Sequence, residues 1–240
     1  MPMATARIIA VFFILWLVLD RAAAFTGSMR GEAGLFVCAL VVALAIAAEC
    51  FVFRRTVRQA VADLGFRTPT RPGVLVAAAM AVAMIGFFPA YALAAGTPMA
   101  LRADWLWLIP GLFAQAGIAE EVVFRGFLFR HFRAGRSFWR AAGLSAIPFV
   151  LVHMLLFATL DFGIALASIV VATSVSFPLA RLFEVSGNAV WGAAVVHFLI
   201  QGLIKIVEVP EAAFLPLAIA WMVFSAIVPW AVFAIRRAPQ

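Results

Sequence analysis

Long apolar runs constrain this sequence more than any other feature. About eight stretches of mostly apolar residues are separated by short loops that carry charges, Pro or Gly. A helix that crosses a bilayer needs about 20 such residues. With 66% hydrophobic and only 12% charged residues, the chain has more apolar surface than a water-soluble core requires. The expected spans are 7–24, 34–53, 73–95, 105–129, 141–159, 162–180, 188–206 and 212–235.

The apolar runs are continuous and lack the alternation of a lipid-facing strand, so they predict helices rather than a barrel. We expect an all-α, polytopic membrane helix bundle of about eight transmembrane helices, with 1–240 as a single integral membrane domain. The first three spans carry almost no buried polar residues, whereas later spans carry nearly all the ionisable groups at membrane depth. A catalytic-type core at about 105–205, preceded by three N-terminal transmembrane helices, is therefore predicted.

Basic residues lie mainly in alternate loops, and thirteen fall on one predicted side against four on the other. The positive-inside rule places the richer side, and with it both termini, in the cytoplasm. These cations indicate topology and contact with anionic lipids rather than nucleic-acid binding, and we expect a protein of the bacterial inner membrane. The richer side holds Arg7, Arg54, Arg55, Arg58, Arg67, Arg71, Arg130, Arg133, Arg136, Arg140, Arg181, Arg236 and Arg237; the other holds Arg21, Arg30, Arg102 and Lys205.

The first span has features of a secretory signal peptide, because an apolar run leads to the small residues of 22–24. Its removal would leave an odd number of spans and break the charge pattern, so we expect it to be retained. Cys38 and Cys50 lie in the second span with no neighbouring His or Cys, and are interpreted as ordinary helix residues. Glu49, near the end of the same span, is predicted to form an interfacial ion pair with Arg54.

Ionisable side chains within a bilayer are costly unless paired or solvated, so each is a candidate functional residue. The fourth span ends with Glu120, Glu121 and Arg125 in an apolar helix. Glu121 and Arg125 are four residues apart with the acid first, the favourable order for a helical ion pair. We assign these two residues to a buried structural pair, which leaves Glu120 available for chemistry.

Two histidines lie at a similar depth on other spans. With a rise of about 1.5 Å per residue, Glu120, His153 and His197 lie roughly 15, 18 and 14 Å from the cytoplasmic ends of their helices. His131, by contrast, follows Arg130 in a basic loop and is predicted to be interfacial. The sequence therefore predicts that three helices bring one carboxylate and two imidazoles close to the middle of the membrane.

Such a site could act in two ways. A carboxylate and a neutral imidazole can hold and deprotonate a water molecule, and the same three residues could instead bind zinc or another divalent metal that supplies a hydroxide. His197 and Gln201, one helical turn apart, could donate hydrogen bonds to the oxyanion of a tetrahedral intermediate. A proton pathway is a further possibility, but transporters usually show broken helices or repeats, and neither is apparent here.

The motifs resemble those of the CAAX prenyl protease and bacteriocin-processing family of intramembrane endopeptidases. The resemblance covers about 105–205 and rests on Glu120-Glu121 followed by Arg125, on Phe149 followed by His153, and on His197. It implies a hydrolase that cleaves a membrane-associated protein or peptide, such as a prenylated CAAX-type protein. It also implies that Glu120 and His153 activate water, and that His197 and Gln201 stabilise the oxyanion.

Gln201 departs from the family pattern, in which this position is usually Asn or Asp. Glutamine keeps the amide on a longer arm, and misplacement by about an ångström can be kinetically expensive. The alternative is therefore a non-proteolytic membrane scaffold or immunity-type binding protein that retains the polar cluster.

Overall fold

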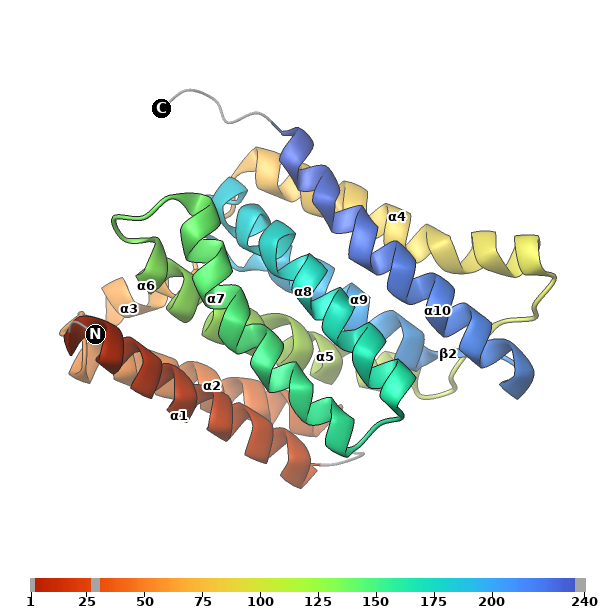
Figure 1. Cartoon of the computed structure of the whole chain (residues 1–240), viewed down its shortest axis with the longest axis horizontal. Coiled ribbons are helices and arrows are strands. Elements are labelled where there is room, and N and C mark those ends of the chain that lie inside the picture. Colours follow the sequence, from red (N-terminus) through yellow and green to blue (C-terminus); the bar gives the residue numbers. More distant parts are fainter. Residues whose placement is uncertain (1–2, 27–30, 236–240) are drawn as a thin grey trace.

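The chain folds into a bundle of helices (Figure 1). The computed structural model describes residues 3–26 and 31–235, so Arg30, Arg236 and Arg237 lie outside the described residues. The α-helices are α1 (Met3–Thr26), α2 (Glu32–Phe51), α3 (Val57–Asp63), α4 (Arg71–Ala95), α5 (Trp105–Leu112), α6 (Arg130–Arg133), α7 (Phe138–His153), α8 (Phe162–Val185), α9 (Trp191–Ile206) and α10 (Glu211–Ile227). Other elements are the π-helical segments η1 (Phe113–Ala119) and η2 (Val122–Phe129), the 3₁₀ segments η3 (Met154–Ala158) and η4 (Val228–Ala234), and the short strands β1 (Ala100–Leu101) and β2 (Val207–Glu208).

The predicted all-α membrane fold is confirmed. Seven helices in the described part of the chain are long and apolar enough to cross a membrane. The predicted seventh span is the exception, because α9 has only 16 residues. It begins at Trp191 rather than at 188, since Gly187 and Asn188 adopt positive φ values of 74° and 60° and form a turn that precedes the helix.

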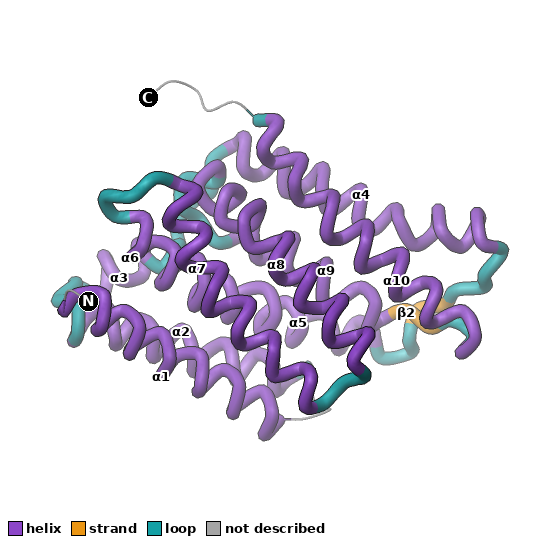
Figure 2. The backbone as a smooth tube through the Cα atoms, viewed as in Figure 1, coloured by secondary structure: helices purple, strands orange, loops and turns teal. Residues whose placement is uncertain are grey.

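The two ends of the bundle differ in structure. Figure 1 shows α3, α6, the start of α1 and the last described residues after α10 at one end, which we call the basic end. The α2–α4 loop reaches α8 and α9 there, since Thr70 N donates to Ser186 O at 3.2 Å and Val190 N donates to Gly65 O at 3.1 Å. At the opposite end, β1 and β2 form a small antiparallel ladder (Figure 2). The chain thus enters and leaves the bundle at the same end.

The helix Trp105–Arg133 runs through α5, η1, η2 and α6 as one span of 29 residues, and the sequence did not predict its π-helical segments. The segment η1 ends at Ala119 and η2 begins at Val122, so Glu120 and Glu121 lie between them. Single π turns within α-helices are uncommon and occur often at functional sites.

Glycines bring neighbouring backbones unusually close to the Trp105–Arg133 helix. A Cβ atom on Gly34 of α2 would lie 2.2 Å from the Gly111 carbonyl oxygen, and one on Gly117 would lie 2.8 Å from that of Ala194 in α9. One on Gly126 would lie 2.3 Å from the Leu64 carbonyl oxygen. Small residues allow this approach in membrane bundles, where water does not drive helix association. The helix is therefore fixed at three levels by backbone contacts.

A cluster at the basic end corrects two predictions. Glu49 is fully buried and pairs with Arg130 and His131, not with Arg54: its Oε1 atom accepts from Arg130 Nη2 and lies 2.9 Å from His131 Nε2. His131 is also largely buried, with its side chain 14% exposed and its ring 4.3 Å from that of Phe53. His131 was predicted to lie in a loop, but it belongs to α6, which continues the long helix and places Arg130 and His131 against Glu49 of α2.

Candidate active site

The midpoint of the long helix carries the candidate active site, and Glu121 is its most buried carboxylate. Its side chain has 0% exposure. The predicted ion pair is present, because Arg125 Nη1 lies 2.6 Å from Glu121 Oε1. The same oxygen also lies 2.6 Å from His197 Nδ1, a contact that the sequence did not predict. Glu121 therefore joins the long helix to α9 as well as pairing with Arg125.

Glu120 faces the other nitrogen of His197 and is 17% exposed. Its Oε2 atom lies 3.6 Å from His197 Nε2 and accepts a hydrogen bond from Gln201 Nε2 at 3.2 Å. Gln201 Nε2 also lies 2.9 Å from His197 Nε2. The amide of Gln201 therefore bridges the Glu120 carboxylate and the His197 ring.

His153 lies beside this network rather than within it. Its Nδ1 atom lies 2.7 Å from the Phe149 carbonyl oxygen, and in the described part of the chain no hydrogen bond joins it to Glu120. The Phe149 ring lies 4.6 Å from the His153 ring and 5.9 Å from the His197 ring, measured between centroids. Arg125 lies over the same ring at 4.8 Å. The Phe149 ring thus lies between His153 and the Arg125–Glu121 ion pair and contacts both His153 and Arg125.

The partners of each imidazole indicate its tautomer. A backbone carbonyl only accepts hydrogen bonds, so His153 Nδ1 carries a proton and its Nε2 atom has a lone pair. The carboxylate of Glu121 likewise accepts a hydrogen bond from His197, so the Nδ1 atom of His197 carries the proton. The lone pair of His197 accepts from the Gln201 amide. No hydrogen bond to His153 Nε2 is found in the described part of the chain, so this nitrogen is available as a base.

The residues do not match a metal centre. Within 3–26 and 31–235, no three His, Cys, Asp or Glu side chains converge as a ligand set. Of the three residues that could bind a metal if one were present, Glu120 and His197 are bridged by Gln201, and His153 lies beside Phe149. No mechanistic step is therefore assigned to a metal.

Sequence reasoning found the polar residues of the site but missed two of its connections. The contact of Glu121 with His197 could not be read from helical spacing, because it depends on how α9 is rotated against the long helix. Phe149 was noted only as part of a motif, although its ring contacts His153, His197 and Arg125. Its place four residues before His153 was the available signal, since such residues share a helix face.

Comparison with known proteins identifies the same part of the chain. Residues 101–203 match the family model described as type II CAAX prenyl endopeptidase Rce1-like. Searches of curated proteins and of solved structures found no match. The matched residues include all six polar residues of the site, and the resemblance seen in the sequence is thereby confirmed. Residues 101–203 are therefore similar to the type II CAAX prenyl endopeptidases of the Rce1-like family.

Proposed function

We propose that this protein is an active endopeptidase that cleaves a peptide bond of a membrane-associated protein or peptide, such as a prenylated CAAX-type protein. In this proposal, Glu120 and His153 activate the water molecule that attacks the bond. The observation that carries the proposal is the asymmetry of the adjacent carboxylates. Glu121 is fully buried and bound by Arg125 and His197, whereas Glu120 is 17% exposed and, among the described residues, accepts hydrogen bonds only from the Gln201 amide. Glu120 is therefore the carboxylate that can receive a proton.

Glu120 and the Nε2 atom of His153 both present lone pairs. A water molecule between them can donate one hydrogen bond to each, which orients its oxygen toward a substrate carbonyl. Transfer of a proton to Glu120 then accompanies attack by the water oxygen on the carbonyl carbon. The proton later passes to the leaving amine as the peptide bond breaks.

Gln201 links this proton transfer to binding of the oxyanion. In the resting site its amide donates to the Glu120 carboxylate and to His197. When Glu120 is protonated, it becomes a weaker acceptor, because hydrogen bonds to an ionised group are about twice as strong as neutral ones. The amide is then available to the oxyanion that forms at the same moment. His197, fixed by Glu121, keeps the amide in place.

The proposed setting is a bacterial inner membrane with the basic end in the cytoplasm. The arginines at that end support this orientation.

Cleavage of a membrane-associated peptide by the purified protein in vesicles tests the proposal. We expect wild-type protein to cleave it and Glu120→Gln to leave it intact. Chelator should not change the rate, because the described donors do not form a ligand set. If the wild-type protein binds such peptides and never cleaves them, the non-proteolytic alternative is correct.

A further inference from the structure

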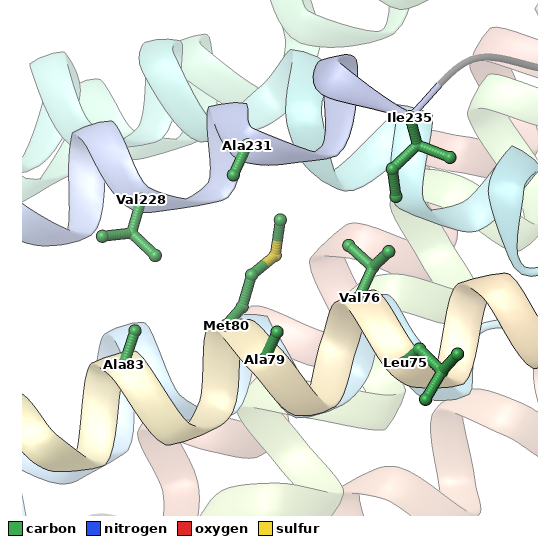
Figure 3. Close-up of a pocket in the computed structure, with 8 residues that line it drawn as sticks. All are labelled: Leu75, Val76, Ala79, Met80, Ala83, Val228, Ala231 and Ile235. Carbon is green, nitrogen blue, oxygen red and sulfur yellow. The ribbon is translucent and has the colours of Figure 1, made fainter.

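A groove lies between α4 and η4, away from the candidate active site (Figure 3). It has a volume of about 340 Å³. Its lining is aliphatic apart from the sulfur of Met80, which extends from α4 toward the opposite helix in Figure 3. Its lining residues are Leu75, Val76, Ala79, Met80, Ala83, Val228, Ala231 and Ile235.

The groove runs along the direction of an acyl chain. From Leu75 to Ala83 the α4 wall rises about 12 Å at 1.5 Å per residue. Both walls belong to candidate membrane spans, Arg71–Ala95 and Glu211–Ala234. The short side chains of Ala79, Ala83 and Ala231 leave the space open. A flexible hydrocarbon chain can fill such an irregular surface.

The groove has cationic side chains at its basic end. Arg71 is exposed at the first position of α4, one helical turn before the lining residue Leu75. On the other wall, Arg181 Nη2 donates to the carbonyl oxygen of Ile235 at 3.5 Å. Arg181 also lies 3.6 Å from Glu184, so the positive charge on this side is partly balanced. Arginine near a membrane surface attracts anionic headgroups.

We propose that this groove binds an anionic phospholipid, with one acyl chain between α4 and η4 and the phosphate headgroup beside Arg71. The apolar walls select a lipid tail, and the cation at one end selects its charge. This site is separate from the proteolytic reaction and does not depend on it.

Native mass spectrometry of the detergent-solubilised full chain tests the proposal, using an equal mixture of phosphatidylglycerol and phosphatidylcholine with the same acyl chains. We expect wild-type protein to retain phosphatidylglycerol about fivefold over phosphatidylcholine, since one arginine near a membrane contributes about 1 kcal/mol. Arg71→Gln should abolish that preference. Arg140→Gln removes another exposed arginine of the basic end and should keep it.

The second part of the experiment fills the groove with a larger side chain. Ala79→Phe should lower retention of both lipids several-fold, whereas Ala78→Phe should not, because Ala78 is exposed on the same helix and does not line the groove. If Ala79→Phe fails to fold, Ala83→Leu makes the same test with a smaller side chain.

Equal retention of the two lipids by wild-type protein would overturn the proposal, as would equal behaviour of Ala79→Phe and Ala78→Phe. An unchanged preference in Arg71→Gln would overturn the headgroup contact. A lipid-free dimer that Ala79→Phe dissociates would assign the groove to a second copy of the chain instead.

Discussion

The middle of the long helix and its basic end contain two clusters built from the same parts. At each, a fully buried glutamate places one oxygen between an arginine and a histidine: Glu121 between Arg125 and His197, and Glu49 between Arg130 and His131. In each, the second carboxylate oxygen has no hydrogen-bond partner in the described part of the chain. A buried Glu, Arg and His set is therefore not in itself a sign of catalysis.

The clusters differ in what lies beside that set. Glu121 is adjacent to Glu120, a carboxylate that is partly exposed and held by an amide. Beside Glu49 the neighbouring acid is Asp63, which lies 3.6 Å from Arg130 and 3.5 Å from Arg55, so it is balanced by cations. We infer that the unneutralised second carboxylate distinguishes a reactive site from a structural one.

The largest effect on cleavage should come from Glu120→Gln, which keeps the shape of the side chain and removes its basicity. We expect a loss of about 10²–10⁴-fold in kcat, the usual contribution of a general base. Thermal unfolding should change little, because no described arginine forms an ion pair with Glu120. Cleavage at the wild-type rate would refute the inferred role of the second carboxylate.

Glu121→Gln should have the second-largest effect on cleavage, and it should lower both kcat and the stability of the fold. Losing the acceptor of His197 should lower kcat about 10–100-fold, as for other residues that orient a functional imidazole. Losing one partner of a buried pair should also lower the free energy of unfolding by about 3–5 kcal/mol. Arg125→Met serves as the matched variant and should reduce stability more than activity. If Glu121→Gln retains full activity, the contact with His197 has no catalytic importance.

Gln201→Asn should have a smaller effect. Asparagine is the common family residue, but its shorter arm cannot bridge Glu120 and His197 as Gln201 does. We expect a fall of about tenfold in kcat, below the hundredfold that a misplacement of 1 Å can cause. A variant that cleaves faster than wild type would show that the bridge is not the productive arrangement.

Glu49→Ala should have the smallest effect on cleavage and sharpens the comparison most. It leaves Arg130 and His131 without their buried acceptor, so the free energy of unfolding should fall by about 3–5 kcal/mol. The rate per folded molecule should stay within about twofold of wild type, measured at a temperature where circular dichroism shows both proteins folded. A large loss of rate there would make the basic-end cluster part of the active site.

Much of the fold could be predicted because membrane helices reveal themselves by length and hydropathy. The ends of the long helix were harder to predict from the sequence. The fourth span was expected to end near Phe129, but the helix continues to Arg133. Its π-helical segments have no simple sequence pattern. The predicted length of α9 was too great because apolar residues continue into the turn before Trp191.

The sequence indicated that the polar residues of the candidate site would gather at one level, but it indicated few of their contacts. Depth along a helix follows from residue number, so the agreement in level of Glu120 and His197 could be anticipated. Rotation about the helix axis depends on packing, so the bond from His197 to Glu121 could not. For the same reason Glu49 was assigned to Arg54, which is near in sequence, rather than to Arg130, which is 81 positions away.

The glycine contacts of the long helix determine which wall of the site can open for a substrate. A backbone that touches another backbone through Gly34, Gly117 or Gly126 has no side chain to rotate out of the way. On the α7 side, the contact is made by rings, with Phe124 and Phe149 at 4.6 Å between centroids, and rings can re-pack by changing rotamer. We infer that, if the site takes a peptide, the peptide enters past α7, the helix that also carries His153.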